Sequence, residues 1–236
     1  MATPGKIYLI PTPISDADPK KVLPADLLDK LPDIDTFFVE NIRTSRRFLS
    51  KAGITDIQEL KFEVLNKDTD PQTVENMLKI VKDGKDVGIM SEAGCPGIAD
   101  PGSVLTLLAH KYTIDIVPFT GPSSIFLALM ASGFNGQNFQ FHGYLPVDKD
   151  ARKRALLNLE KLVYTRNQTQ IFMETPYRNN QVLATMLHTL REDSLLCVAA
   201  NISAEKESIR TKTIREWRQK TPDLHKQPVI FLLYKK

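Results

Sequence analysis

One segment near the middle of the chain joins a short apolar run, a glycine- and proline-rich loop and the start of a helix. Val87–Met90 is apolar throughout, which is typical of a strand covered on both faces of a sheet. Ser91–Gly97 holds two glycines and a proline, which end the strand and keep an open loop at its carboxyl end. Asp100 and Pro101 are expected as N-cap and first residue of a helix that continues over Val104–Ala109. Open α/β sheets bind ligands at such junctions, because bare backbone N–H groups face the cleft; an ordinary strand-to-helix turn is the alternative.

The first half of the chain alternates apolar strands with helices, which predicts a parallel, doubly wound sheet. The expected strands are Ile7–Ile10, Thr36–Glu40, Val87–Met90 and Ile114–Pro118. The expected helices are Leu23–Leu31, Thr44–Ala52, Val74–Asp83, Val104–His110 and one that opens at Gly121-Pro-Ser-Ser124 and ends at Ser132.

A second set of elements begins near Asn138. Its expected strands are Phe139–Tyr144, Gln170–Glu174, Leu195–Ala200 and Val229–Tyr234, and its expected helices are Asp150–Leu162 and Tyr177–Arg191. We therefore expect two α/β domains, 1–119 with the parallel sheet and 120–236. No flexible linker separates them, so we expect a firm interface with a cleft between the domains.

Composition narrows the class of protein. With 236 residues, 42% of them hydrophobic, the chain can bury two cores of ordinary size. It has no apolar run of about 18 residues, so no membrane span is expected, and its start resembles a strand rather than a signal peptide. Two cysteines, Cys95 and Cys197, suit a reducing cytoplasm. The four histidines are scattered, and no metal site is expected.

Charge is unevenly distributed along the chain. Residues 1–117 hold 14 lysines and arginines against 18 aspartates and glutamates, whereas residues 118–236 hold 17 against 10. A basic half joined to an acidic half favours a polyanionic partner such as RNA, with a solvated surface as the equal alternative.

Neither GxGxxG nor GxxxxGK[ST] occurs, which argues against a common nucleotide fingerprint. A series of segments in order instead resembles the tetrapyrrole-methylase superfamily, and within it the branch that methylates a ribose 2′-hydroxyl of small-subunit ribosomal RNA. The segments are Pro11-Thr-Pro-Ile14, Val39-Glu-Asn-Ile-Arg-Thr-Ser-Arg-Arg47, Ser91-Glu-Ala-Gly-Cys-Pro-Gly-Ile-Ala-Asp-Pro-Gly102, Val117-Pro-Phe-Thr-Gly-Pro-Ser-Ser124, Ala131-Ser-Gly133, Phe139-Gln-Phe-His-Gly-Tyr-Leu-Pro146 and Ile171-Phe-Met-Glu-Thr-Pro-Tyr-Arg178.

The resemblance implies a two-domain α/β homodimer that binds S-adenosylmethionine between its domains, releases S-adenosylhomocysteine and uses no metal. The implied cofactor-binding residues are Ala93, Gly94, Cys95, Pro96, Ile98, Ser123, Ser124, Met173, Ala200 and Pro228. Small residues at 93–95 allow the backbone to approach the cofactor closely. Cys95 stands where the family usually has threonine, and a small buried apolar role is the alternative for it.

Methyl transfer to a ribose hydroxyl gains from alignment and from a base or cation that lowers the hydroxyl pKa. The implied catalytic residues are Glu40 and Arg43. Arg46 and Arg47 are expected to contact phosphate, or else form a solvated basic turn. Arg178 is expected to hold the substrate backbone, with a surface arginine at a helix start as the alternative.

The chain departs from the ribosomal-RNA branch at several polar positions. Phe62–Asn66 replaces Tyr-His-Glu-His-Asn, and Ala200–Ala204 replaces Arg-Glu-Leu-Thr-Lys, while Pro13–Asp16 and Asn41–Arg43 also differ from the usual patterns. The cofactor loops are kept while acceptor-side charges are lost. Three hypotheses therefore stand: an RNA ribose methyltransferase, a tetrapyrrole C-methyltransferase, and a non-catalytic module that binds S-adenosylmethionine or RNA.

Overall fold

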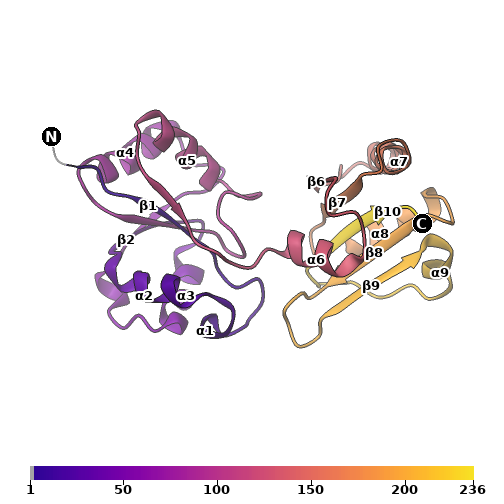
Figure 1. Ribbon diagram of the computed structural model, residues 1–236, viewed down its shortest axis with the longest axis horizontal. Helices are drawn as coiled ribbons and strands as arrows, with labels where there is room; N and C mark the ends of the chain where they lie inside the picture. Colours follow the sequence, from indigo (N-terminus) through magenta and orange to yellow (C-terminus); the bar gives the residue numbers. More distant parts are fainter. Residues whose placement is uncertain (1–2) are drawn as a thin grey trace. The chain divides into compact units, whose positions relative to one another are not determined.

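The computed structural model describes residues 3–236, so Met1 and Ala2, part of the first expected domain, lie outside the described residues. The chain forms two compact units: the first ends at Ser123, and the second is Ser124–Lys236. The sequence analysis placed this boundary between residues 119 and 120. Each unit is built on a sheet covered by helices (Figure 1).

The sheet of the first unit has the strand order β3-β2-β4-β1-β5, and each neighbouring pair is parallel. Its strands are β1 (Ile7–Ile10), β2 (Thr36–Val39), β3 (Lys61–Val64), β4 (Val87–Met90) and β5 (Ile116–Pro118). The predicted parallel, doubly wound sheet is confirmed. Since all the strands run the same way, the loops after β1, β2, β4 and β5 meet at one edge of the sheet.

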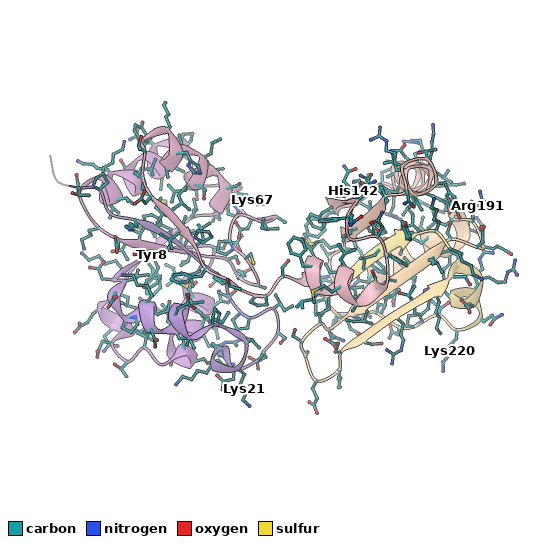
Figure 2. All side chains as sticks on the ribbon, in the orientation of Figure 1. Tyr8, Lys21, Lys67, His142, Arg191 and Lys220 are labelled. Carbon is teal, nitrogen blue, oxygen red and sulfur yellow. The ribbon has the colours of Figure 1, made fainter. Side chains whose placement is uncertain are left out.

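Helices cover both faces of this sheet. They are α1 (Pro19–Val22), α2 (Ala25–Lys30), α3 (Ile42–Ala52), α4 (Pro71–Lys82) and α5 (Gly102–Lys111), with 3₁₀ turns at Leu31–Asp33 and Ile57–Glu59. Phe38 and Ile89 pack with α4 and α5 on one face, while Phe37 and Met90 pack with α2 and α3 on the other. Figure 2 shows Tyr8 inside this layered core, with Lys21 and Lys67 at the surface.

The structure corrects three expectations in the first unit. The helix expected over Leu23–Leu31 is shorter, Ala25–Lys30, because Leu23 and Pro24 are extended and precede α2. Strand β3 was not expected, since it is an edge strand whose side chains are mostly exposed. Asp100 is not the N-cap of α5: Pro101 occupies that position, and the helix begins at Gly102.

The second unit holds a mixed sheet in the order β6-β7-β10-β8-β9. Its strands are β6 (Phe139–Tyr144), β7 (Thr169–Met173), β8 (Leu195–Ala200), β9 (Ser208–Thr213) and β10 (Val229–Tyr234). Its helices are α6 (Ser124–Ser132), α7 (Lys149–Arg166), α8 (Asn179–Thr189) and α9 (Ile214–Gln219). Only the β6–β7 pair is parallel, among the strands of residues 124–236. Helices α7, α8 and α9 share one core with Phe172 and Phe231, and α6 contacts β8, β9 and β10.

Strand β9 and helix α9 were not expected from the sequence. The residues of β9 are mainly polar, and the strand forms only because it pairs along the whole of β8 at the sheet edge. Helix α9 is short and is held by a capping box between Thr213 and Glu216. Within residues 3–236, no helix has both the length and the apolar character that crossing a bilayer requires.

Candidate active site

The loop after β4 is fastened to the loop after β1. Thr12 and Gly94 exchange two backbone hydrogen bonds, with N···O distances of 2.9 and 3.0 Å. The Thr12 hydroxyl donates to the Ser91 carbonyl at 3.3 Å, and the Ser91 hydroxyl donates to the Gly94 carbonyl at 3.2 Å. The expected cofactor loop is therefore bonded to the loop after β1 at its first residue, Ser91, and at its middle residue, Gly94.

The backbone conformation at Gly94 favours a residue without a side chain. Its φ of +82° lies in the left-handed region. A Cβ built there would lie 3.4 Å from Ile14 Cγ2 and 3.5 Å from the Pro122 carbonyl oxygen. A Cβ at this position would therefore already be in contact with Ile14 and Pro122 at a backbone cost, and a longer side chain would have to displace one of them.

Asp100 closes the far end of the same loop. Its Oδ1 accepts hydrogen bonds from Gly97 N at 2.6 Å and from Gly102 N at 2.8 Å, so it holds the loop to the start of α5. Its Oδ2 is buried and has no hydrogen-bond partner among residues 3–236. Burial raises the pKa of this carboxyl group above its usual value.

The loop after β5 completes this edge of the first unit. The Cys95 thiol donates to the Pro122 carbonyl with Sγ 3.4 Å from the oxygen. Burial raises the pKa of the Cys95 thiol, so the thiolate needed for a nucleophile is disfavoured. At Gly121 a Cβ would come within 2.2 Å of Pro11, which shows how closely the two loops approach.

The groups that remain unpaired along this edge are suited to a polar ligand. The backbone N–H groups of Ala93 and Cys95 form no hydrogen bond within residues 3–236, nor does the hydroxyl of the half-buried Ser123. Ser124, the first residue of the second unit, also has a hydroxyl without a partner in that range. Such donors fit the carboxylate and ribose oxygens of S-adenosylmethionine. Pro96 is buried beneath the loop, and Ile98 is 56% exposed and presents an apolar surface beside it.

Glu40 follows β2 and is hydrogen-bonded to the same loop. Its Oε2 accepts from Glu92 N at 3.1 Å. Burial is the main reason why the pKa of Glu40 is raised, with the negative charges of Asp100 and Glu92 adding to it. Arg43 is exposed and forms no ion pair within the described residues, so Glu40 and Arg43 are not brought into contact.

Two expected phosphate-binding arginines lie on α3. The Arg46 guanidinium lies 5.2 Å from the centre of the Phe62 ring, a cation–π contact. Arg47 is 3.7 Å from Asp16, which also binds Lys51 at 2.6 Å. The hydrogen bond and charge of Lys51 lower the pKa of Asp16. A pocket of about 230 Å³ lies beside these groups and is lined by Arg47, Asp16 and the loop residue Ala93.

The expected cofactor residues of the second unit gather at one edge of its own sheet. Met173 pairs with Ile230, and Ala200 pairs with Val229, so the ends of β7 and β8 lie beside the start of β10. Pro228 precedes β10, and its carbonyl accepts a hydrogen bond from Asn201 N at 3.0 Å. The antiparallel register thus brings Met173, Ala200 and Pro228 together, although they are far apart in sequence.

Arg178 is held by its own unit. Its NH2 atom lies 3.0 Å from Oε2 of Glu174, a carboxylate with a fully buried side chain, and also donates to the Pro146 carbonyl at 3.3 Å. The Arg178 side chain is only 22% exposed. A structural role as the counterion of Glu174 therefore competes with the expected substrate contact.

Sequence reasoning quoted Thr12 and Asp16 within motifs but assigned neither a role. Thr12 is 4% exposed and locks the loop, and Asp16 holds Arg47 and Lys51 together. The only available signal was their place directly after β1, at the ligand-binding edge of the sheet. Within residues 3–236, no three His, Cys, Asp or Glu side chains are placed to hold a metal ion together.

Comparison with known proteins defines the class. The family described as Tetrapyrrole (Corrin/Porphyrin) Methylases matches residues 6–217. The chain belongs to this family, and it is therefore a methyltransferase.

Similar proteins include several with one name, Ribosomal RNA small subunit methyltransferase I. That of Thermotoga maritima is 29% identical over 221 residues, which are 92% of this chain and 94% of that protein. That of Vibrio cholerae is 28% identical over 231 residues, 97% of this chain and 76% of the relative. That of Buchnera aphidicola is 27% identical over 232 residues, 97% of this chain and 78% of the relative.

Solved structures share the fold. The crystal structure of diphthine synthase matches with a TM-score of 0.71 at 12% identity, covering 98% of this chain and 90% of that one. The crystal structure of the methyltransferase CobJ matches with a TM-score of 0.65 at 14% identity, covering 98% and 94%. At these identities the likeness concerns the fold alone.

Proposed function

We propose that the protein transfers a methyl group from S-adenosylmethionine to a ribose 2′-hydroxyl of small-subunit ribosomal RNA. The observation that carries this proposal is the loop at Ser91–Gly97, in which the N–H groups of Ala93 and Cys95 are free to bind a ligand. The chain is also similar over almost its whole length to ribosomal RNA methyltransferases. The acceptor rests on those relatives, and the donor rests on the family and on the fit of the loop.

In this proposal, the bound cofactor supplies an electrophilic methyl group on a sulfonium. The loop contributes by binding and orientation: the N–H groups of Ala93 and Cys95 donate to the anionic oxygens, and the bonds from Thr12 and Asp100 keep those donors fixed. In-line displacement depends strongly on alignment, so a rigid loop is an advantage. The assignments of Met173, Ala200 and Pro228 to the same ligand stay predictions.

Glu40 is proposed as the base that accepts the hydroxyl proton. It lies at the carboxyl end of β2, bonded through Glu92 N to the cofactor loop. Its raised pKa makes it a stronger base than an ordinary glutamate. Arg43 is exposed on the first turn of α3 and is proposed to lie near the acceptor as a cation.

The alternatives differ in what happens after cofactor binding. The segment Ala200–Ala204 lacks charged residues. Its turn is closed by a hydrogen bond from Ala204 N to the Asn201 carbonyl at 2.9 Å, and Asn201 Nδ2 donates to Gln227 Oε1 at 2.6 Å. The charges that the ribosomal-RNA branch carries there are therefore not replaced within this turn. This is the observation that keeps a non-catalytic binding module as the second candidate.

The first experiment measures transfer of labelled methyl from S-adenosylmethionine into unmodified small ribosomal subunits, with cofactor binding measured by calorimetry in parallel. Label in RNA at one site that resists alkaline cleavage is the expected result. Cofactor binding without any label in RNA would refute the proposed acceptor and favour the binding module. A tetrapyrrole pigment that copurifies and becomes labelled would favour the C-methyltransferase.

The acceptor side is tested with Arg46→Ala combined with Arg47→Ala. Removing two phosphate contacts should reduce the slope of RNA affinity against salt by about 1 to 2, without changing cofactor affinity. The matched control is Lys21→Ala with Lys79→Ala, which removes two exposed cations from α1 and α4 of the same unit. An equal change in both pairs would mean that only net charge matters, and it would refute this RNA path.

A further inference from the structure

A basic groove lies between α7 and α8 of the second unit and uses none of the residues assigned to the active site. Its volume is about 580 Å³. Lys149, Arg152 and Lys153 of α7 line one side, and His188 and Thr189 of α8 line the other. Asp150 is the carboxylate that also lines it.

Arg152 gives this groove a buried positive charge. The residue is 1% exposed, and its NH1 atom donates to the carbonyls of Val147 at 2.8 Å and Pro146 at 3.4 Å. Its Nε donates to the Thr185 hydroxyl at 3.4 Å. Among residues 3–236 it forms no ion pair with a carboxylate. A cation out of water without a counterion is costly, so an anion that enters the groove would lower that cost through the electrostatic field of Arg152.

The rim of the groove adds mobile positive charge. Lys149 and Lys153 are exposed, four residues apart on one face of α7, and neither forms an ion pair within the described part of the chain. Lys149 is also the first residue of α7, whose N-terminus is already capped by the Asp148 carboxylate, so the anion must be held by the side chains of the groove. The hydroxyl of Thr189 is buried and has no hydrogen-bond partner among residues 3–236.

We propose that this groove binds a backbone phosphate of the RNA that the enzyme methylates, at a contact separate from the residues assigned above. This inference rests on the proposed function. A phosphate suits the site because its oxygens can accept from both ammonium groups while its negative charge offsets the buried guanidinium beside them. RNA is favoured over a free phosphate because residues 118–236 carry 17 basic against 10 acidic residues, which attract a polyanion along the unit. The contact positions RNA and reads no sequence.

The test is Lys149→Ala with Lys153→Ala, two exposed positions whose loss leaves the core intact. Labelled small-subunit ribosomal RNA is titrated with full-length protein by fluorescence anisotropy over a range of salt concentrations. The pair should lower the salt slope of binding by about 1 to 2 and leave cofactor affinity unchanged. The matched control is Lys161→Ala with Arg166→Ala, which removes two exposed charges from the same helix outside the groove.

A second measurement separates RNA from free phosphate. Inorganic phosphate is titrated into isotope-labelled protein while the amide signals of residues 149–153 are followed by NMR, in wild type and in the lysine pair. Shifts in the wild type that the lysine pair abolishes support an anion site. If these shifts occur but the RNA salt slope is unchanged, the groove takes free phosphate and the RNA assignment is overturned.

The comparison between the groove pair and the control pair decides whether the site is specific. Equal slope changes in the groove pair and the control pair would overturn a specific site, as would unchanged slopes in both. If the groove pair alone weakens RNA binding while wild type transfers no methyl to small subunits, the groove assignment holds and the proposed function fails.

Discussion

Removing the guanidinium of Arg178 should destabilise the second unit strongly, because it leaves a buried carboxylate without its counterion. The Glu174 side chain is fully buried and lies 3.0 Å from Arg178 NH2. Breaking a buried pair by removing one partner costs about 3–5 kcal/mol, and we take about 3 kcal/mol because Arg178 is 22% exposed. With a typical urea dependence of about 2 kcal/mol per molar, Arg178→Ala should lower the midpoint by about 1.5 M.

The single tryptophan makes this measurement specific to the second unit. Trp217 is 4% exposed in that unit's core, and its Nε1 donates to the Leu196 carbonyl at 2.8 Å. Its fluorescence therefore reports unfolding of the second unit alone, whatever the first unit does.

Glu174→Gln provides the matched control for Arg178→Ala. Glutamine keeps the oxygen that accepts from Thr175 N at 2.7 Å but carries no charge. In the Arg178→Ala background it should restore most of the lost stability, giving a coupling energy of about 2 kcal/mol in a double-mutant cycle. A midpoint shift below about 0.3 M for Arg178→Ala, or no rescue by Glu174→Gln, would refute the counterion argument. If Arg178→Ala left the midpoint unchanged but lowered the RNA salt slope, Arg178 would be assigned to the expected substrate contact and not to the counterion role.

Two further predictions concern the first unit. Gly94→Leu should weaken S-adenosylmethionine binding about tenfold or more in calorimetry, since overpacking a tight site costs about 1–3 kcal/mol. The control is Gly133→Leu, because Gly133 also has a positive φ, +78°, and a Cβ built there would have nothing within 4 Å. An affinity of Gly94→Leu within about threefold of wild type would refute the loop assignment. For Glu40, methyl transfer should rise with pH through its raised pKa, and Glu40→Gln should lose this rise together with about 100-fold or more in rate. A carboxyl group whose pKa is raised by folding contributes to folding stability at acid pH, and this contribution is lost as the pH rises through the folded-state pKa. Relative to wild type, Glu40→Gln should therefore stabilise the first unit at neutral pH and not at acid pH. A pH profile unchanged in this variant would rule Glu40 out as the base.

Most strands and helices of the two cores followed from the sequence because they rest on local patterns. Apolar runs such as Val87–Met90 and Leu195–Ala200 coincide with strands β4 and β8, since a buried strand must be apolar along its length. The loop after β4 could likewise be placed by its glycines and proline, which end a strand by their own backbone preferences. The family resemblance, carried by ordered motifs, is confirmed by the match over residues 6–217.

Elements whose stability depends on a partner escaped prediction. Strand β9 is polar and exists because β8 offers it a complete ladder of hydrogen bonds, and β3 is likewise an exposed edge strand. The sequence pattern of an exposed edge strand such as β3 or β9 carries too little apolar signal to separate the strand from a loop.

By itself, then, the sequence determined the fold class, the two-part organisation and the loop at Ser91–Gly97, because these depend on short-range pattern and on motif order. Only the tertiary structure decided which groups are paired. In the structure, Gly94 is hydrogen-bonded to Thr12, Arg178 forms an ion pair with Glu174, and Arg152 is buried without a carboxylate partner among residues 3–236. Gly94 and Thr12 are distant along the chain, and the energy of the local Arg178–Glu174 pair depends on burial and distance, which no sequence pattern encodes.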